Sequence, residues 1–376
     1  MRLCIVTHNI IKGDGQGRAN YEIVLEAIRR GYHVTLVAIN VSPELQQNSQ
    51  VKWIPITVKG FPTALLSNLF FTWQSRHWLQ QHHHEFDLLQ VYGCVTDYPA
   101  DINTFQFVHS GWLRSPAHTW RLQKNLYGAY QWLFTALNAH WEKKACQISK
   151  ILVAVSEGIK QELIDIGVDQ KKIRVILNGV DVEEFVPEVR ERSQFSLPEQ
   201  VTLALFAGDI RTNRKNLDTV LHGLVHVPDL HLAVVGNVTK SPYPQLASQL
   251  GLSERVHFLG YRRDIAEIMK AVDFFVFPSR YEPFGMVVSE AMATGLPVIT
   301  TAISGVAEIV TPESGVVLND SEDVIALTDA MAKLASDRDL RLQMGQVARA
   351  IAEQHTWKSK AKIYVDLFEE LHQGKA

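Results

Sequence analysis

Residues 274–300 read FFVFPSRYEPFGMVVSEAMATGLPVIT and contain a strand, a loop, a helix and a second strand. The run FFVF is short and continuously apolar, which is typical of a strand buried on both faces of a parallel sheet. The next loop carries Glu282 and Gly285, a helix is predicted from about Met286 to Thr294, and a glycine and a proline end it. The run LPVITT at 296–301 predicts the following strand. Units of this kind build doubly wound α/β domains.

The same alternation of apolar runs and helix-length segments covers most of the chain. A polar stretch with two prolines, within 181–200, predicts a linker between two such halves. We therefore expect an α/β protein of two Rossmann-like domains, 1–182 and 183–356, and a final helix from Trp357 to Leu371. The predicted strands are 2–9, 33–40, 51–57, 87–93, 104–110 and 150–156 in the first half, and 201–208, 230–236, 256–260, 274–279 and 296–301 in the second.

Composition excludes several classes of protein. The 376 residues are 46% hydrophobic and 20% charged, which excludes a mainly disordered chain. A net charge of -3 excludes the overall basic character of a nucleic-acid binder. The three cysteines form no CxxC pair, no cleavable signal follows the first apolar run, and no run of about 18 apolar residues occurs. We expect a cytoplasmic protein.

The loop and helix at 282–290 have the chemistry of a nucleotide site. Glu282 lies where a strand ends, Gly285 allows a ligand to approach the backbone, and the helix N-terminus favours phosphate. Glu290 is placed to accept hydrogen bonds from ribose hydroxyls. The alternative for either glutamate alone is a solvent-facing helix residue.

A second loop, 208–216, gathers the cations Arg211, Arg214 and Lys215 between a predicted strand and a helix. Cations in such a place stabilise the charge of a departing nucleoside diphosphate. The alternative is a solvated basic loop at the edge of a sheet.

The pattern E-x7-E with EPFG at its start resembles the donor-site signature of retaining GT-B glycosyltransferases, family 4 (group 1) in particular. Matching segments extend over nearly the whole chain. They are the glycine loop 13–17, VH at 108–109, VAVSEGIK at 153–160, NGVD at 178–181, FAGDIRTNRKN at 206–216, GVAEIV at 305–310 and Trp357.

The resemblance implies a GT-B enzyme that transfers a hexose from a nucleoside-diphosphate sugar with retention of configuration, with its last helix packed on the N-terminal, acceptor-side domain. It implies that Lys215 contacts the diphosphate. The arginine that usually follows the glycine of this loop is replaced by Asp209 and Ile210, so Arg211 is the substitute and Arg214 the reserve. It implies front-face attack without a metal ion or cofactor.

The remaining site residues come from the same resemblance. His109, which closes the predicted strand 104–110, contacts the donor sugar, although a lone histidine there is more often structural. The donor side includes Gly208, Phe284, Gly285, Met286 and Glu308. The glycine loop approaches phosphate and acceptor through Gly15, Gly17, Arg18 and Asn20.

Two features outside the signature bear on partners. The run His82–His84 cannot converge on one ion from a helix, so no metal site is expected. The segment 111–150 holds four tryptophans and six Lys or Arg against one acid, Glu142, which suits peripheral contact with an anionic membrane. The alternative is packing on the sheet by an apolar stripe: Leu126, Tyr130, Leu133, Leu137 and Trp141.

A glycan, a lipid-linked sugar or a small molecule fits the acceptor role equally well at this stage. An inverting transferase, a sugar-nucleotide epimerase and a non-catalytic nucleotide-sugar binder remain alternatives. A nicotinamide dehydrogenase is the weakest, because 13–17 lacks the GxGxxG spacing and the next strand ends in Asn40 instead of an acid.

Overall fold

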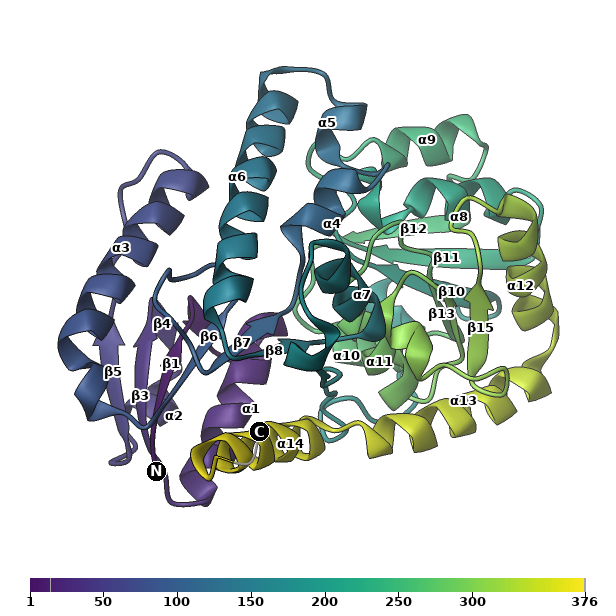
Figure 1. Ribbon diagram of the computed structural model, residues 1–376. Coiled ribbons are helices and arrows are strands. Elements are labelled where there is room, and N and C mark those ends of the chain that lie inside the picture. Colours follow the sequence, from purple (N-terminus) through teal and green to yellow (C-terminus); the bar gives the residue numbers. More distant parts are fainter. Residues whose placement is uncertain (14, 375–376) are drawn as a thin grey trace. The chain divides into compact units, whose positions relative to one another are not determined.

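The computed structural model describes residues 1–13 and 15–374, and the chain forms two compact units (Figure 1). The first unit is Met1–Gly179 together with the chain from Trp357 onward, and the second is Val180–Thr356. Each has a parallel sheet with helices on both faces, so the predicted α/β class with two Rossmann-like domains is confirmed.

The first unit contains a seven-stranded parallel sheet in the order β5-β3-β1-β6-β7-β8-β9. Because the chain leaves β1 toward β3 and later returns to β6 on the other side, its topological switch point lies between β1 and β6. The strands are β1 (Arg2–Val6), β3 (His33–Ala38), β5 (Val51–Pro55), β6 (Leu88–Tyr92), β7 (Ile102–Phe105), β8 (Ile151–Ala154) and β9 (Ile173–Val175), with β2 (Asn9–Ile10) and β4 (Asn40–Val41) paired separately.

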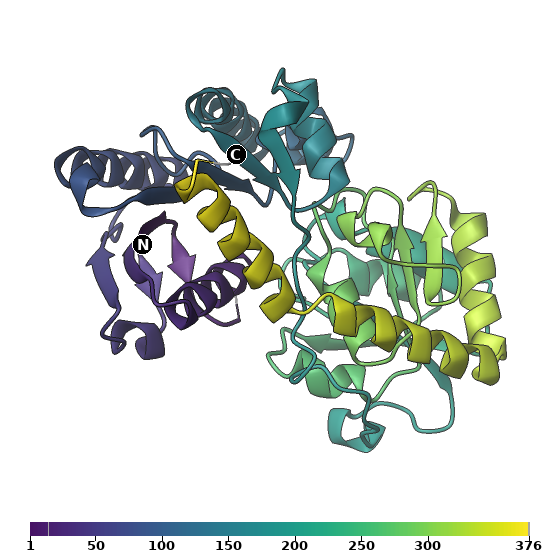
Figure 2. The same ribbon diagram turned by 60° about the horizontal axis from the view of Figure 1, so that its bottom comes forward.

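Alternate residues of β1 define the two cores of this unit. Leu3 and Ile5 pack with α1 and α14, whereas Cys4 and Val6 pack with α3. Figure 2 shows α3 and α6 on one face of the sheet and α1 and α14 on the other. The helices are α1 (Gly15–Arg29), α2 (Pro43–Gln46), α3 (Ala64–His82), α4 (His109–Arg114), α5 (Thr119–Leu122), α6 (Leu126–Ile148), α7 (Glu157–Asp165) and α14 (Trp357–His372), with 3-10 turns η1 (His83–Glu85) and η2 (Gln170–Lys172).

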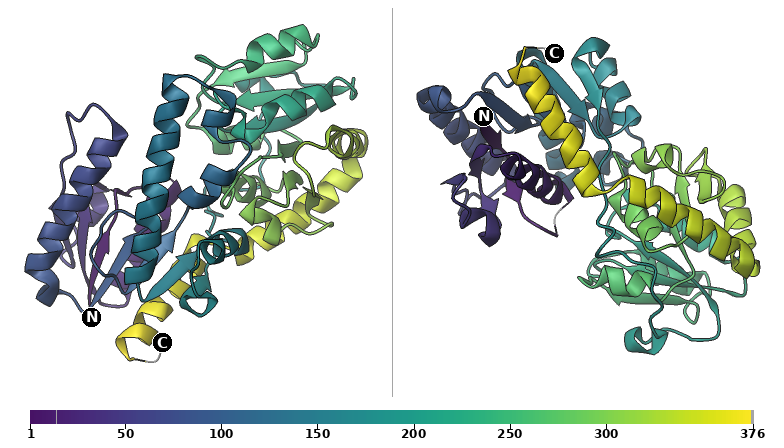
Figure 3. Two further views of the ribbon diagram at one scale, coloured as in Figure 1. Left: turned by 45° about the horizontal axis from the view of Figure 1, so that its top comes forward. Right: turned by 90° about the horizontal axis from the view of Figure 1, so that it is seen from below.

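Helix α14 belongs to the first unit although it follows the second in sequence. Tyr364, Val365 and Phe368 are buried in the core beside α1. The right panel of Figure 3 shows α14 alongside α1. The expected return of the last helix to the N-terminal domain is therefore observed.

The second unit contains a six-stranded parallel sheet in the order β12-β11-β10-β13-β14-β15, with its switch point between β10 and β13. Its strands are β10 (Thr202–Ala207), β11 (Leu230–Val235), β12 (Val256–Gly260), β13 (Phe274–Phe277), β14 (Val298–Thr301) and β15 (Gly315–Leu318). Its helices are α8 (Leu217–Leu224), α9 (Tyr243–Gln249), α10 (Ile265–Met269), α11 (Met286–Ala293), α12 (Val324–Ser336) and α13 (Arg338–Gln354), with 3-10 turns η3 (Arg192–Phe195), η4 (Asn213–Lys215) and η5 (Gly305–Glu308).

Two predicted boundaries are wrong. The strand expected at 104–110 ends at Phe105, because the chain turns there and begins α4 at His109. Helix α1 begins at Gly15, so Gly15 and Gly17 of the predicted glycine loop 13–17 belong to its first turn. The short strands β9 and β15 were not predicted.

Candidate functional site

The predicted donor residues of the second unit come from loops at the carboxyl ends of β10 and β13, the strands that flank its switch point. Ligands of open parallel sheets bind at such points because the loops on either side diverge. Lys215 ends η4 after β10, and Glu282 lies in the loop after β13.

The ammonium of Lys215 pairs with the carboxylate of Glu282. Both side chains are nearly enclosed, with exposed fractions of 12% and 11%. Burial lowers the pKa of Lys215, and the Glu282 carboxylate partly counters that effect. The Lys215 Nζ also lies 5.0 Å from the centroid of the Phe277 ring, a cation–π contact. Lys215 is thus a nearly enclosed cation paired with a carboxylate from a different loop.

Gly208 and Gly285 allow this close packing. A Cβ on Gly208 would lie 3.3 Å from Cγ of Lys215. Gly285 has φ +99°, a left-handed conformation, and a Cβ there would lie 3.1 Å from Cγ1 of Val306. The Val306 amide donates to the Phe284 carbonyl at 2.7 Å, which ties the loop after β14 to the start of α11.

The predicted donor-side residues around α11 differ in exposure. Phe284 is buried beneath the loop, whereas Met286, the first residue of α11, is partly exposed. Glu290 is partly exposed on α11, and burial, helped by the charge of Glu184, raises its pKa to about 7. Glu308 is exposed at the end of η5.

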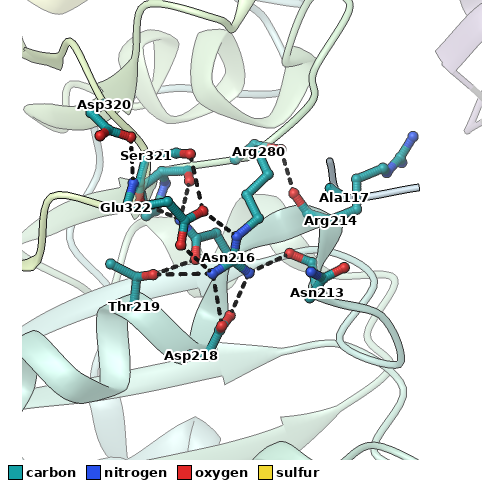
Figure 4. Close-up of polar contacts among 12 residues, drawn as sticks. Ala117, Asn213, Arg214, Asn216, Asp218, Thr219, Arg280, Asp320, Ser321 and Glu322 are labelled. Atoms are coloured by element: carbon teal, nitrogen blue, oxygen red, sulfur yellow. Dashed lines mark hydrogen bonds and ion pairs between the residues drawn. The ribbon is translucent and has the colours of Figure 1, made fainter. Parts of the chain in front are cut away.

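A residue absent from the predicted site, Arg280, joins the two donor loops (Figure 4). Its guanidinium donates to both carboxylate oxygens of Asp218, each at 2.8 Å. It also donates to Glu322 at 2.5 and 2.9 Å and to the Asn213 carbonyl at 2.9 Å. Its backbone amide donates to the Arg214 carbonyl at 2.9 Å. These bonds fix the position of Lys215 relative to the loop of Glu282.

Asn216 reinforces the same junction. With φ +67°, it is left-handed, and its side-chain amide donates to the carbonyls of Pro278 and Ser321 at 2.9 and 2.6 Å. The hydroxyl of Thr219 donates to the side-chain oxygen Oδ1 of Asn216 at 2.5 Å. Sequence spacing gave no sign of this scaffold, since its members are separated by up to about a hundred residues.

The two candidate arginines of the loop differ in environment. Nε of Arg211 pairs with Oδ1 of Asp209 at 2.9 Å, so an acid two residues away holds the substitute cation. The side chain of Arg214 points away from the Arg280 cluster in Figure 4. Its charge contributes to lowering the pKa of Lys215.

The first unit has a cavity of about 170 Å³ at the carboxyl ends of β1, β6 and β7. Its lining includes His109, the residue expected to contact the sugar. The remaining lining residues are His8, Gln16, Asn68, Leu69, Thr72, Tyr92, Gly93, Cys94, Val95, Thr104, Gln106, Phe107, Asn138, Trp141 and Glu142.

His109 was expected to close a strand. Instead it is the first residue of α4 and lies beside a buried carboxylate. Its backbone amide donates to Glu142 at 2.7 Å, and the Ser110 amide donates to the same carboxylate at 3.3 Å. Burial raises the pKa of Glu142 to about 7 and lowers that of His109 to about 4. The sequence did not predict this role for Glu142. The available signal was that Glu142 is the one acid in the basic segment 111–150.

Two of the residues predicted to approach phosphate and acceptor, Arg18 and Asn20, contact other residues of the same unit. Arg18 pairs with Glu22 on α1 at 2.9 Å. Asn20 is fully buried, and its amide donates to the Thr7 hydroxyl at 3.1 Å and the Asn9 carbonyl at 2.9 Å. In this conformation Asn20 therefore holds the chain after β1 in place. Asp14, within the predicted loop, lies outside the described residues.

The aromatic segment 111–150 exposes much of its apolar surface. Leu126 is 92% exposed and Leu133 is 45% exposed, so for these two residues the packing alternative is wrong. The face of α6 that packs inward instead carries small residues such as Gly128, Ala139 and Ala145. No described helix is long and apolar enough to cross a membrane.

No three His, Cys, Asp or Glu side chains come together as a metal site in the part of the chain that the structure describes. In the His82–His84 run, Nδ1 of His82 contacts Glu85 at 2.6 Å.

The chain matches two families that together span most of its length. Residues 13–184 match Glycosyltransferase Family 4, and residues 188–351 match Glycosyl transferases group 1. A D-inositol 3-phosphate glycosyltransferase from Xylanimonas cellulosilytica is 31% identical over 60% of this chain and 58% of its own. The enzyme of that name from Corynebacterium urealyticum is 31% identical over 55% and 54%. The chain thus spans little more than half the length of these relatives.

Solved structures share the fold over nearly the whole chain. A sucrose-phosphate synthase from Thermosynechococcus elongatus has a TM-score of 0.81 at 19% identity, covering 99% of both chains. WaaG, a glycosyltransferase involved in lipopolysaccharide biosynthesis, has a TM-score of 0.73 at 21% identity, covering 97% and 99%. Anabaena Alr3699/HepE in complex with UDP and glucose has a TM-score of 0.71 at 19% identity, covering 98% and 100%. With its two parallel-sheet units and these family matches, the chain belongs to the group 1, family 4 glycosyltransferases of the GT-B fold.

Proposed function

We propose that the protein transfers a hexose from a nucleoside-diphosphate sugar to an acceptor with retention of the anomeric configuration. The observation that carries the proposal is the enclosed ion pair of Lys215 and Glu282 at the switch point of the second unit. A related fold binds such a ligand, since Alr3699/HepE was solved with UDP-glucose.

The donor diphosphate takes the place of the Glu282 carboxylate as the partner of Lys215. Arg211 or Arg214 adds a second cation, and the first turn of α11 adds its dipole. The displaced Glu282 accepts hydrogen bonds from sugar hydroxyls, and Glu290 accepts them from the ribose. Charge that develops on the leaving diphosphate is thus met by cations in a nearly enclosed site, where electrostatic stabilisation is strong.

The acceptor oxygen attacks the anomeric carbon on the face that the diphosphate leaves. The bond from the anomeric carbon to the phosphate oxygen breaks, the bond to the acceptor oxygen forms, and the acceptor proton passes to the leaving phosphate. His109 contacts the sugar as a neutral imidazole, because its pKa is about 4. No protein nucleophile and no cofactor are required.

Two measurements test this function. A thermal-shift series with UDP, GDP, ADP and their sugars should show stabilisation by one nucleotide. NMR of the product formed from that donor should then show the donor's anomeric configuration. An inverted product would identify an inverting transferase, and stabilisation without any transfer or hydrolysis would identify a non-catalytic binder.

A peripheral contact of the first unit with an anionic membrane is the second part of the proposal. The segments 45–84 and 102–141 contain no Asp or Glu, and they include α3, α5 and most of α6. Their exposed apolar side chains include Trp73, Leu126 and Trp132, which are 61%, 92% and 47% exposed. Exposed apolar side chains beside cations, in segments that themselves carry no acid, are the composition of a surface that rests on anionic lipid.

The lengths of these helices support the contact. Helix α6 has 23 residues and therefore extends about 35 Å, while strands of four to six residues extend about 13–20 Å. The N-terminal turns of α3 and α6 consequently project beyond the carboxyl edge of the first sheet (Figure 1).

A further inference from the structure

The cavity of the first unit contains polar groups but no cation. Among the described residues that line it, amides, hydroxyls and imidazoles predominate, Glu142 is the one acid, and neither Lys nor Arg is present. Phosphorylated ligands are normally held by Arg, Lys or a helix N-terminus, because a dianion must be neutralised when it is desolvated. The lining of this cavity does not supply that neutralisation.

The start of α4 does not serve as an anion site either. The amides of its first two residues, His109 and Ser110, already donate to the Glu142 carboxylate. The imidazole of His109 is neutral at physiological pH, since burial lowers its pKa to about 4. Its Nδ1 is buried without a hydrogen-bond partner among the described residues. A phosphate here would therefore meet a carboxylate and an uncharged ring.

Cations close in sequence to the lining residues are engaged elsewhere. Arg18, two residues after Gln16 on α1, pairs with Glu22 at 2.9 Å. Lys12 lies over the Tyr21 ring at 5.0 Å. Lys144, two residues after Glu142, is exposed and faces Asp97 at 4.0 Å.

The cavity has the size and chemistry for one sugar ring. A cavity of about 170 Å³ has room for several water molecules and therefore for a small ring. The indole of Trp141 offers an apolar surface for a ring face, and Asn68 on α3 lines the cavity with an amide suited to hydroxyls. Asn138 on α6 also lines the cavity, but its amide already donates to the Phe134 carbonyl at 2.7 Å.

We propose that this cavity is the acceptor subsite and that it accepts an uncharged, hydroxyl-rich ring, a sugar or cyclic polyol, in preference to its phosphorylated counterpart. The inference rests on the proposed transferase function. It separates this chain from the two relatives described above, which are named for D-inositol 3-phosphate.

The test is transfer from the donor found by the nucleotide screen to matched acceptor pairs, each neutral ring beside its phosphate ester. The panel contains myo-inositol with its 3-phosphate, and glucose, mannose, galactose and N-acetylglucosamine with their 6-phosphates, as free compounds and as octyl glycosides of the neutral rings. We expect kcat/KM at least tenfold higher for the neutral member of every pair that is used. A phosphate ester preferred to its neutral partner, or transfer to none of the neutral rings, would overturn the proposal.

An added cation should reverse the preference. Asn68→Lys places an ammonium in the lining and should raise the ratio of phosphorylated to neutral turnover at least tenfold. Gln80→Lys adds the same charge on an exposed turn of α3 outside the lining and should leave the ratio unchanged. An equal change in both variants would mean that the cavity does not select the acceptor. Stabilisation by the donor nucleotide, measured in each variant, reports on the second unit and so distinguishes failure of this inference from failure of the proposed function.

Discussion

Lys215 and Glu282 neutralise each other in the second unit, and each is only about one-tenth exposed. They lie 67 residues apart in sequence, on loops after different strands, and meet because β10 and β13 are neighbours. Two groups expected to act on different parts of the donor thus stabilise each other before the donor arrives.

Removing one member of this pair should cost both activity and stability. Lys215→Ala and Glu282→Ala should each lower turnover at least tenfold, and each leaves an uncompensated, nearly enclosed charge. The double variant Lys215→Ala/Glu282→Ala removes both charges and should melt at a higher temperature than either single variant. Calorimetry of the four proteins without ligand measures this coupling. Additive losses in the double variant would contradict the pairing, and wild-type turnover in both single variants would refute the site.

Arg280 should act as a positioning residue for the donor loops. Arg280→Ala removes the bonds to Asp218, Glu322 and Asn213, and should cost about 2 kcal/mol, or about 4–8 °C in melting temperature. We expect a larger loss in kcat than in nucleotide affinity, because the guanidinium orients Lys215 without contacting the base. Lys150→Ala, which breaks an exposed ion pair with Asp101, is the control. It should leave the melting temperature, kcat and nucleotide affinity unchanged.

The ionisation of Glu290 should make stability depend on pH. Its pKa in the folded chain is raised from 4.5 to about 7, so its charge destabilises the folded state as pH rises through that interval. The cost is complete above pH 7 and is at most about 3 kcal/mol, reduced by the partial exposure of the side chain. Glu290→Gln should therefore be more stable than wild type at pH 8 and equal to it near pH 4. Unfolding in urea at both pH values measures the difference, and identical pH profiles would show that ionisation of Glu290 does not destabilise the folded state.

Membrane contact should depend on the exposed apolar residues of α6. The variant Leu126→Glu/Trp132→Glu should lose at least tenfold in cosedimentation with phosphatidylglycerol vesicles at low salt. Ile325→Glu, at a site 76% exposed on α12 of the second unit, should bind vesicles like wild type. Binding that is absent in wild type, or equal in all three proteins, would remove the membrane from the proposal.

Transfer should persist in EDTA. Lys215, an arginine of its loop and the first turn of α11 are proposed to stabilise the negative charge of the leaving diphosphate. Chelation of divalent ions should therefore reduce the rate less than twofold. The assay is product formation from a donor stock freed of divalent ions. Strict dependence on added Mg²⁺ or Mn²⁺ would show that a metal ion stabilises the leaving diphosphate.

The sequence was most informative where the chemistry is local. The apolar run of β13, the left-handed Gly285 and helix α11 all follow one another within twenty residues, and the order of elements there could be predicted closely. Arg280 lies in the same stretch but could not be recognised, because its partners Asp218 and Glu322 come from distant segments. The same holds for Glu142, whose role depends on the turn that brings α4 against α6.

The strand expected to end at His109 shows a different limitation. The run FQFVHS alternates like a strand, and its local pattern did not reveal that hydrogen bonds from His109 and Ser110 to Glu142 stabilise a helix start there. A side chain 33 residues away in sequence therefore determined the local structure.

The position of α14 sets an order for biosynthesis. The second unit is continuous in sequence, whereas the first needs Tyr364, Val365 and Phe368 from the end of the chain to complete its core. A chain made from its N-terminus can therefore finish folding the second unit before the first, even though the first is synthesised earlier. Until α14 leaves the ribosome, the apolar face of α1 that it covers stays open to water.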